Sequence, residues 1–131
     1  MPPALAKILA LLLINDEPEM TFDQIRETLS LSKSATSQAL NQLLTLEKIE
    51  YKTKIGDRKR YFCSRVMRWQ EDTKSQMEGL DFFASLLKQI LEQRPSKTKE
   101  FNASLKKLIS FMDYLAKEMP ILYKKFEDKA A

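Results

Sequence analysis

Two short stretches decide the fold of this chain. The first is Leu31-Ser32-Lys33-Ser34-Ala35-Thr36-Ser37-Gln38-Ala39-Leu40, and the second is Gly56-Asp57-Arg58-Lys59-Arg60-Tyr61-Phe62. In the first, Ser32 is a good N-cap, and the residues after it place Thr36, Leu40 and Leu43 on one helical face. Ala39 and Leu46 extend that face. The second stretch begins with a Gly-Asp turn signal and continues with β-forming residues, so the pair predicts a helix followed by a hairpin.

Two further helices are expected before the first stretch. Residues 4–14 are apolar on nearly every side, as in a helix surrounded by other elements. Thr21 offers a hydroxyl cap with Gln24 three residues later, and this capping pair precedes apolar positions at helical spacing, which are Phe22, Ile25 and Leu29. Three helices therefore precede residue 48.

After residue 48 the apolar period changes from helical to alternating. Ile49, Tyr51, Thr53 and Ile55 alternate with charged residues, which predicts a strand, and Tyr61-Phe62-Cys63 forms the returning strand. The hairpin then carries basic residues 58–60 at its tip.

From residue 67 the pattern is helical again. One apolar stripe contains Met77, Leu80, Phe83, Leu87 and Leu91, and the helix should end at residues 93–96. A second stripe steps by four and three residues, as in helix pairing, through Phe101, Leu105, Leu108, Met112, Leu115 and Met119. Pro120 should stop this helix, leaving a short last one with Ile121, Leu122 and Phe126. We therefore predict two domains, residues 1–66 and 67–131.

The charge is concentrated in one part of the chain. The 131 residues carry a net charge of +4, but residues 1–32 sum to −3, residues 33–68 to +6 and residues 69–131 to +1. A local positive field of this kind suits a phosphate backbone. The absence of histidine and the single cysteine make an enzyme improbable on composition and exclude an intramolecular disulfide. The apolar run 8–14 is too short for a membrane span, so we expect a buried helix and a cytoplasmic protein.

The two stretches quoted above resemble the recognition helix and wing of GbsR/MarR-type winged helix-turn-helix transcriptional regulators, over roughly residues 4–65. The resemblance implies a bacterial homodimer that represses or activates transcription, with the C-terminal helices dimerising. Two features depart from the family. The relatives have a further helix before the first one here, so this chain is expected to be a shortened version or a truncated product. They also have a glycine after the recognition helix, where Glu47-Lys48 must make the turn here.

The recognition helix should present a polar face to the major groove. The side-chain amide of glutamine or asparagine can form two hydrogen bonds with one adenine, while serine and lysine can contact bases or phosphates. The predicted contacts are Ser32, Lys33, Ser34, Ser37, Gln38 and Asn41. An ordinary solvated helix face is the alternative.

The wing should approach the minor groove with Lys52, Lys54, Arg58, Lys59 and Arg60. By the resemblance, Arg58 enters the groove. Gly56 and Asp57 form the wing turn, and Asp57 either orients Arg58, caps the turn or has a simple turn role. Arg65 and Arg68 either reach flanking phosphates or are solvated.

The C-terminal helices have wide apolar stripes, which predict dimerisation through Leu80, Phe83, Leu87, Leu91, Phe101, Leu105, Leu108, Met112 and Leu115. Some relatives respond to small ligands, including choline-like cations. The resemblance therefore leaves open whether this chain binds a small-molecule effector, whose identity is unknown. The aromatic residues Trp69, Phe82, Phe83, Phe111 and Tyr114 suit a cation cage less well than a core or interface. Cys63 is expected to be a buried thiol rather than a redox switch.

The predicted fold class is mainly α, with three helices and a two-stranded wing followed by long dimerisation helices. The predicted function is a homodimeric, sequence-specific regulator that binds double-stranded DNA, with no metal, cofactor, membrane partner or enzymatic activity. A winged helix used only for protein interaction is the alternative.

Overall fold

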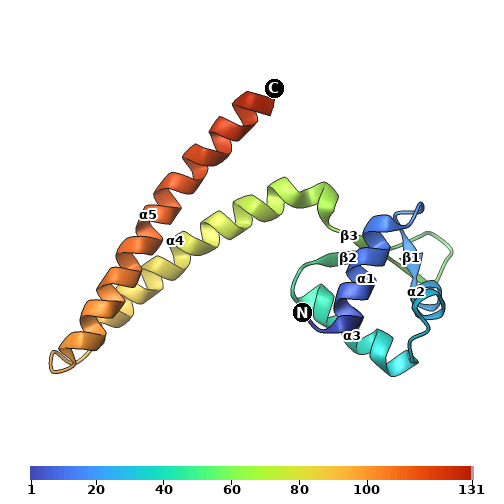
Figure 1. Cartoon of the computed structure of the whole chain (residues 1–131), viewed down its shortest axis with the longest axis horizontal. Helices are drawn as coiled ribbons and strands as arrows, with labels where there is room; N and C mark the ends of the chain where they lie inside the picture. Colours follow the sequence, from blue (N-terminus) through green and yellow to red (C-terminus); the bar gives the residue numbers. More distant parts are fainter. Residues whose placement is uncertain (131) are drawn as a thin grey trace. The chain divides into compact units, whose positions relative to one another are not determined.

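The computed structural model describes residues 1–130, which form two compact units, Met1–Trp69 and a second unit that begins at Gln70. The first unit contains the three predicted helices and the hairpin (Figure 1). Its elements are α1 (Pro3–Ile14), β1 (Met20–Thr21), α2 (Phe22–Leu29), α3 (Lys33–Thr45), β2 (Ile49–Thr53), β3 (Arg60–Ser64) and the short 3-10 helix η1 (Val66–Arg68). The predicted mainly helical winged fold is confirmed.

The sheet has three antiparallel strands in the order β1-β3-β2, one more than the two-stranded wing that the sequence predicts. Phe62 in the central strand lies opposite Met20 on one side and Tyr51 on the other. The strand β1 has only two residues, too few for an alternating pattern, and it exists because its backbone pairs with the free edge of β3. The hairpin is therefore held to the body of the unit along one edge.

The core of the first unit lies between the helices and the sheet. Ile8, Ile25 and Leu43 are fully buried, and Ile49 and Phe62 bring the two wing strands into the same cluster. Full burial of such a side chain contributes about 1.5–3 kcal/mol. The wing is therefore anchored at its base by the same core that holds α3.

The helix starts behave as the sequence predicts. The Thr21 hydroxyl accepts a hydrogen bond from the Gln24 backbone N–H, and the Gln24 side chain accepts one from the Thr21 N–H, which completes a capping box. Ser32 caps α3 by accepting from the Ala35 N–H at 3.1 Å. The start of α3 is thus fixed by local chemistry, independently of the wing.

The end of α3 is made by a non-glycine residue, as predicted. Glu47 has φ of 56°, in the left-handed region. Its N–H donates to the Leu44 carbonyl, and the Lys48 N–H donates to the Leu43 carbonyl at 2.9 Å, the pattern of a Schellman turn. Leu46, predicted to support the buried face, is 55% exposed because the helix ends there.

The wing turn differs from the prediction in one respect. The strand β2 ends at Thr53 and not at residue 55, and Ile55 is fully exposed. The turn residues after Thr53 are not paired in the sheet. The alternating apolar pattern in the sequence therefore extends two residues beyond the end of the strand.

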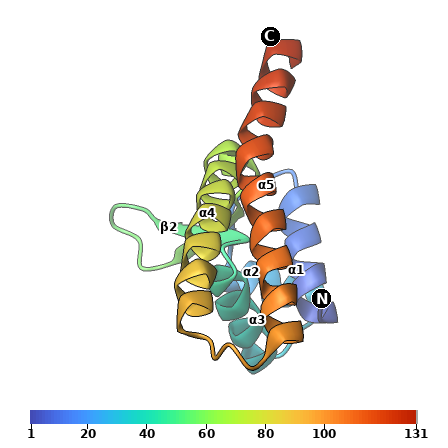
Figure 2. The same cartoon turned by 90° about the vertical axis from the view of Figure 1, so that its left-hand side faces the viewer.

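The second unit is a helical hairpin of α4 (Trp69–Gln93) and α5 (Lys99–Ala130). The two helices run antiparallel (Figures 1 and 2). Ala84, Ile109 and Met112 are buried between them, and Lys88 pairs with Asp113 at 2.9 Å. Among the described residues, neither helix has the length and hydropathy that crossing a membrane requires.

The prediction that Pro120 ends its helix is wrong. The helix α5 continues through Pro120 to its end at Ala130. Proline fits helical φ, although it removes one N–H donor and its ring crowds the carbonyl four residues earlier, and 21 residues of helix already precede it, so the following turn needs no new nucleus. Met119 and Tyr123, on either side of it, are half-buried.

Replacing Glu47 with glycine should stabilise the first unit. The left-handed conformation costs a non-glycine residue about 1 kcal/mol, which glycine avoids. We expect Glu47→Gly to raise the free energy of unfolding by up to about 1 kcal/mol in urea denaturation. Glu47→Ala is the control, since alanine keeps the conformational cost. Equal gains from both substitutions would contradict this origin.

Candidate nucleic-acid interface

The outer face of α3 is polar and takes no part in the packing of the core. Thr36, Ala39, Leu40 and Leu43 are buried, while all six predicted contact residues are exposed. Thr36 is buried without an unsatisfied hydroxyl, because its Oγ1 donates to the Ser32 carbonyl at 2.8 Å. The helix thus separates its two faces completely.

Two of the six predicted contact residues are engaged locally. The Ser32 hydroxyl caps the helix and lies 3.4 Å from the Ser34 hydroxyl. Within the described part of the chain, no hydrogen bond or ion pair occupies the side chains of the other four, which are Lys33, Ser37, Gln38 and Asn41. These four side chains are available to a partner.

The wing turn is held by Asp57. Its Oδ1 accepts a hydrogen bond from the Lys59 N–H at 2.9 Å, and its Oδ2 accepts one from the Tyr61 hydroxyl. Gly56 beside it has φ of 79°, which glycine adopts without strain. Asp57 therefore caps the turn, and among the described residues it forms no hydrogen bond or ion pair with the Arg58 guanidinium.

The hydrogen bond between Asp57 and Tyr61 shifts both groups. The Tyr61 hydroxyl, followed by the Lys59 N–H, lowers the pKa of Asp57, and the Asp57 carboxylate raises the pKa of Tyr61. Both pKa shifts favour the forms that make this hydrogen bond, which are the ionised carboxylate of Asp57 and the protonated hydroxyl of Tyr61. The pair therefore stabilises the turn from the ordinary carboxyl pKa up to the ordinary phenol pKa, and this contribution is lost as pH falls through the lowered pKa of Asp57.

The five predicted wing cations fall into three groups. Arg58 and Lys59 lie at the tip, which projects from the unit (Figure 2), and neither side chain has a hydrogen bond or ion pair within the described residues. Arg60 stacks over the Tyr51 ring at 4.5 Å. Lys52 and Lys54 are both paired with Glu19, a residue that sequence reasoning did not include.

Arg65 and Arg68 are also engaged. Each lies 3.1 Å from a carboxylate oxygen of Glu50, and Arg68 belongs to η1 after the second wing strand. The sequence did not predict the role of Glu50 either. Glu50 lies opposite Cys63 in the strand pairing, and Arg65 follows Cys63 by two residues. The net charge of +6 over residues 33–68 therefore overstates the positive charge that is available to bind a partner.

Cys63 is half-buried beside this cluster. Its Sγ lies 3.9 Å from a Glu50 oxygen, and burial, followed by that carboxylate, raises the pKa of the thiol. A raised pKa keeps the thiol protonated and weakly reactive, which favours the structural interpretation over a redox switch.

The predicted dimerisation residues divide between two faces of the hairpin. Met112 is buried, and five leucines are half-buried, namely Leu80, Leu87, Leu91, Leu105 and Leu115. The remaining three, Phe83, Phe101 and Leu108, are 43–57% exposed. The structure adds Phe82, Leu86, Ile90 and Phe111 to this outer apolar set.

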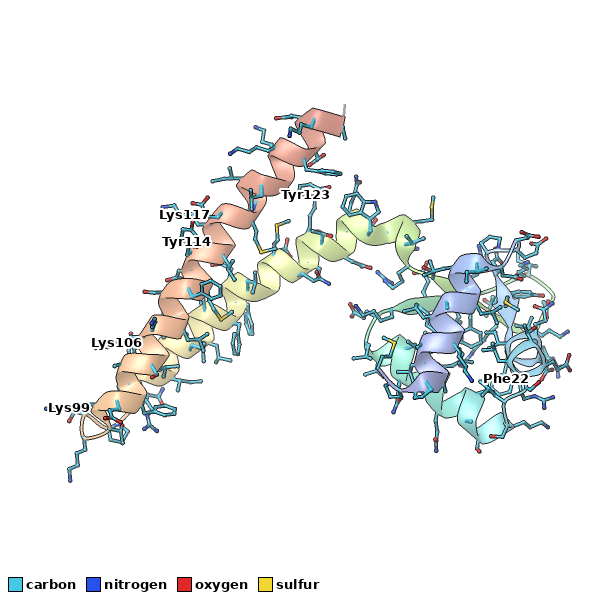
Figure 3. All side chains as sticks on the ribbon, in the orientation of Figure 1. Phe22, Lys99, Lys106, Tyr114, Lys117 and Tyr123 are labelled. Carbon is cyan, nitrogen blue, oxygen red and sulfur yellow. The ribbon has the colours of Figure 1, made fainter. Side chains whose placement is uncertain are left out.

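Four of the five residues considered for a cation cage belong to the second unit, and these four do not converge. Phe82, Phe83, Phe111 and Tyr114 are 43–73% exposed, and no two of these rings are in contact. Tyr114 lies on the side of α5 turned away from α4, whereas Tyr123 points toward α4 (Figure 3). Across residues 1–130, no three His, Cys, Asp or Glu side chains gather in a way that could hold a metal ion.

Removing the Tyr61 hydroxyl should release the wing turn. We expect Tyr61→Phe to raise the pKa of Asp57 toward its ordinary value, because the strongest hydrogen bond to the carboxylate is lost. NMR titration of the Asp57 carboxyl measures this directly. Tyr114→Phe, which removes an exposed hydroxyl from the other unit, should leave the titration unchanged. An unaltered Asp57 pKa in Tyr61→Phe would contradict the assignment.

No protein-family model and no curated protein matches this chain. Solved structures do match it. A structure described as a transcriptional regulator is 18% identical, covers 93% of this chain and 85% of its own, and aligns with a TM-score of 0.66. This alignment confirms a winged helix followed by long helices as the fold.

Two structures of the MarR family also align, with lower scores. The zinc-responsive ZitR of Lactococcus lactis is 18% identical, with 91% of this chain and 76% of that one covered and a TM-score of 0.47. The regulator NMB1585 of Neisseria meningitidis is 19% identical, with 95% and 80% covered and a TM-score of 0.44. The support for the predicted fold is the alignment at a TM-score of 0.66, and the GbsR branch of the resemblance stays a prediction.

Proposed function

We propose that this chain, which has a MarR-like winged-helix fold, is a transcriptional regulator that binds double-stranded DNA as a homodimer. The observation that carries the proposal is the outer face of α3, where Lys33, Ser37, Gln38 and Asn41 are exposed and unbonded within the described residues. A helix with one face in the core and a free polar face beside a basic hairpin suits the major groove.

Each part of the interface has a distinct task. Gln38 and Asn41 read base edges, because their amides offer a donor and an acceptor that match adenine. Lys33 and the serines at residues 32, 34 and 37 contact phosphates or bases at the start of α3. Arg58 enters the minor groove, with Lys59 and Arg60 near the backbone, and Lys52 and Lys54 add charge along the strand. In this proposal residues 1–66 bind DNA and residues 67–131 dimerise.

The outer apolar set of the hairpin supports the homodimer. Phe83, Leu86 and Ile90 recur at i, i+3 and i+7 on α4, and they are exposed in the single chain. A contiguous apolar stripe of this kind is costly in water and is relieved by burial against a second copy. Two-fold symmetry would then place two recognition helices about one DNA turn apart on a near-palindromic operator.

The alternative is a winged helix that binds protein and not DNA. It would use the same apolar hairpin but would not need the free polar face of α3. A mobility shift with random duplex separates the two, since only the DNA-binding proposal predicts retention that weakens with salt.

Substitutions in the two parts of the interface should have different effects. We expect Arg58→Ala to weaken binding to selected and random duplexes alike and to reduce the salt slope by about 1. Gln38→Ala or Asn41→Ala should instead reduce discrimination between the duplexes by about tenfold. Fluorescence anisotropy on both duplexes measures these effects, with Lys106→Ala on α5 as a matched control (Figure 3). Unchanged affinities in either set would disprove the site assignment.

A charge on the outer apolar set should separate the two copies. We expect the unaltered chain to sediment as a dimer at micromolar concentration and Phe83→Asp to weaken dimerisation by at least about a hundredfold, since a buried ring is replaced by a desolvated carboxylate. Analytical ultracentrifugation measures both. Lys106→Asp, on an exposed polar face, should remain dimeric. A monomeric unaltered chain would count against the homodimer.

A further inference from the structure

Glu19 lies immediately before β1 and contacts two lysines of the wing. Its Oε1 lies 2.6 Å from Lys52 Nζ, and its Oε2 lies 3.4 Å from Lys54 Nζ. The Glu19 side chain is 23% exposed, whereas both lysine side chains are more than half exposed. One carboxylate from the body of the unit therefore holds two cations that the wing would otherwise present to solvent.

The sheet brings these three residues together. Lys52 lies opposite Tyr61 in the central strand, and Tyr61 lies opposite Thr21 in β1. Because Phe62 faces the core, Tyr61 and Lys52 face outward, on the side where Glu19 enters the sheet. Lys54 Nζ lies 4.1 Å from the centre of the Tyr61 ring and so contacts both this ring and the Glu19 carboxylate.

The contact is an ionised pair at neutral pH. The hydrogen bond with Lys52 lowers the pKa of Glu19, and the same bond raises the pKa of Lys52. A carboxylate with one oxygen toward each ammonium offers these lysines what two oxygens of a DNA phosphate would offer.

We propose that Glu19 acts as an internal competitor for DNA, holding Lys52 and Lys54 in ion pairs and so limiting the sequence-independent affinity of the wing. This inference rests on the proposed function and deepens it. A lysine paired with Glu19 must exchange that carboxylate for a phosphate, so it contributes less than a free cation. The unpaired tip residues, Arg58 and Lys59, then supply most of the wing's binding.

The consequence is a lower affinity for DNA of every sequence. Phosphate contacts bind every sequence alike, whereas the α3 face distinguishes them. A residue that weakens the phosphate contacts without touching α3 therefore lowers binding to selected and random DNA alike and leaves base discrimination unchanged. Glu19 is therefore a residue that sets the overall DNA affinity of the wing without itself touching DNA.

The test compares the unaltered chain with Glu19→Gln on a random duplex over a series of salt concentrations. Glutamine keeps the shape of the side chain but not its charge. We expect Glu19→Gln to bind about three- to tenfold more tightly, with a salt slope steeper by about 0.9 to 1.8, one or two added phosphate contacts. Glu17→Gln is the matched control, because it removes the same charge in the same turn but no ion pair, and it should stay within about twofold of the unaltered chain.

A second comparison assigns the effect to the two lysines. We expect the double substitution Lys52→Gln and Lys54→Gln to weaken binding by about twofold in the unaltered chain but by about tenfold in the Glu19→Gln background. Circular dichroism confirms that each variant is folded.

The outcomes separate the two proposals. A chain that binds duplex with a clear salt slope, but whose Glu19→Gln variant binds no more tightly, overturns this inference alone. So does a gain in Glu19→Gln that persists without the two lysines. An unaltered chain that binds no duplex overturns the proposed function and this inference with it.

Discussion

The register of the central strand β3 determines how the rest of the first unit is arranged. Phe62 is buried and pairs with Met20 and Tyr51, which joins the core, the short edge strand and the wing in one position. Because side chains alternate along a strand, this burial forces Tyr61 to the outer side. There it reaches Asp57 in the turn and supports Lys54, while Lys52 beside it meets Glu19. A shift of one residue in the register of β3 would exchange the side chains on its two faces and remove the contact between Tyr61 and Asp57 that holds the wing turn.

The features that the sequence predicted correctly are the ones with local causes. Ser32 and Thr21 cap their helices with backbone groups three residues away, and the buried face of α3 follows from helical spacing. The non-glycine turn at Glu47 also follows from one local pattern. The polar face of α3 could be predicted as well, because it is what remains once the buried positions are assigned.

The features that the sequence did not predict depend on contacts between distant residues. The strand β1 has too short a pattern of its own and exists through its pairing with β3. Glu19 and Glu50 engage four of the cations that charge counting assigned to the surface, and neither pairing is visible until the strands are registered. Helix α5 continues past Pro120 because the 21 residues of helix before it spare the next turn a new nucleus. Likewise, the apolar stripes of α4 and α5 divide into inner and outer sets only when the two helices are paired.

The separation of the two faces of α3 has a consequence for how such a protein can change. Thr36, Leu40 and Leu43 hold the helix in the core, and none of the outward residues Lys33, Ser37, Gln38 or Asn41 takes part in that packing. Exposed substitutions of this kind usually change folding free energy by less than about 0.5 kcal/mol. If the outer face reads DNA, descendants of this chain can therefore drift from one target sequence to another, one residue at a time, without passing through an unstable ancestor.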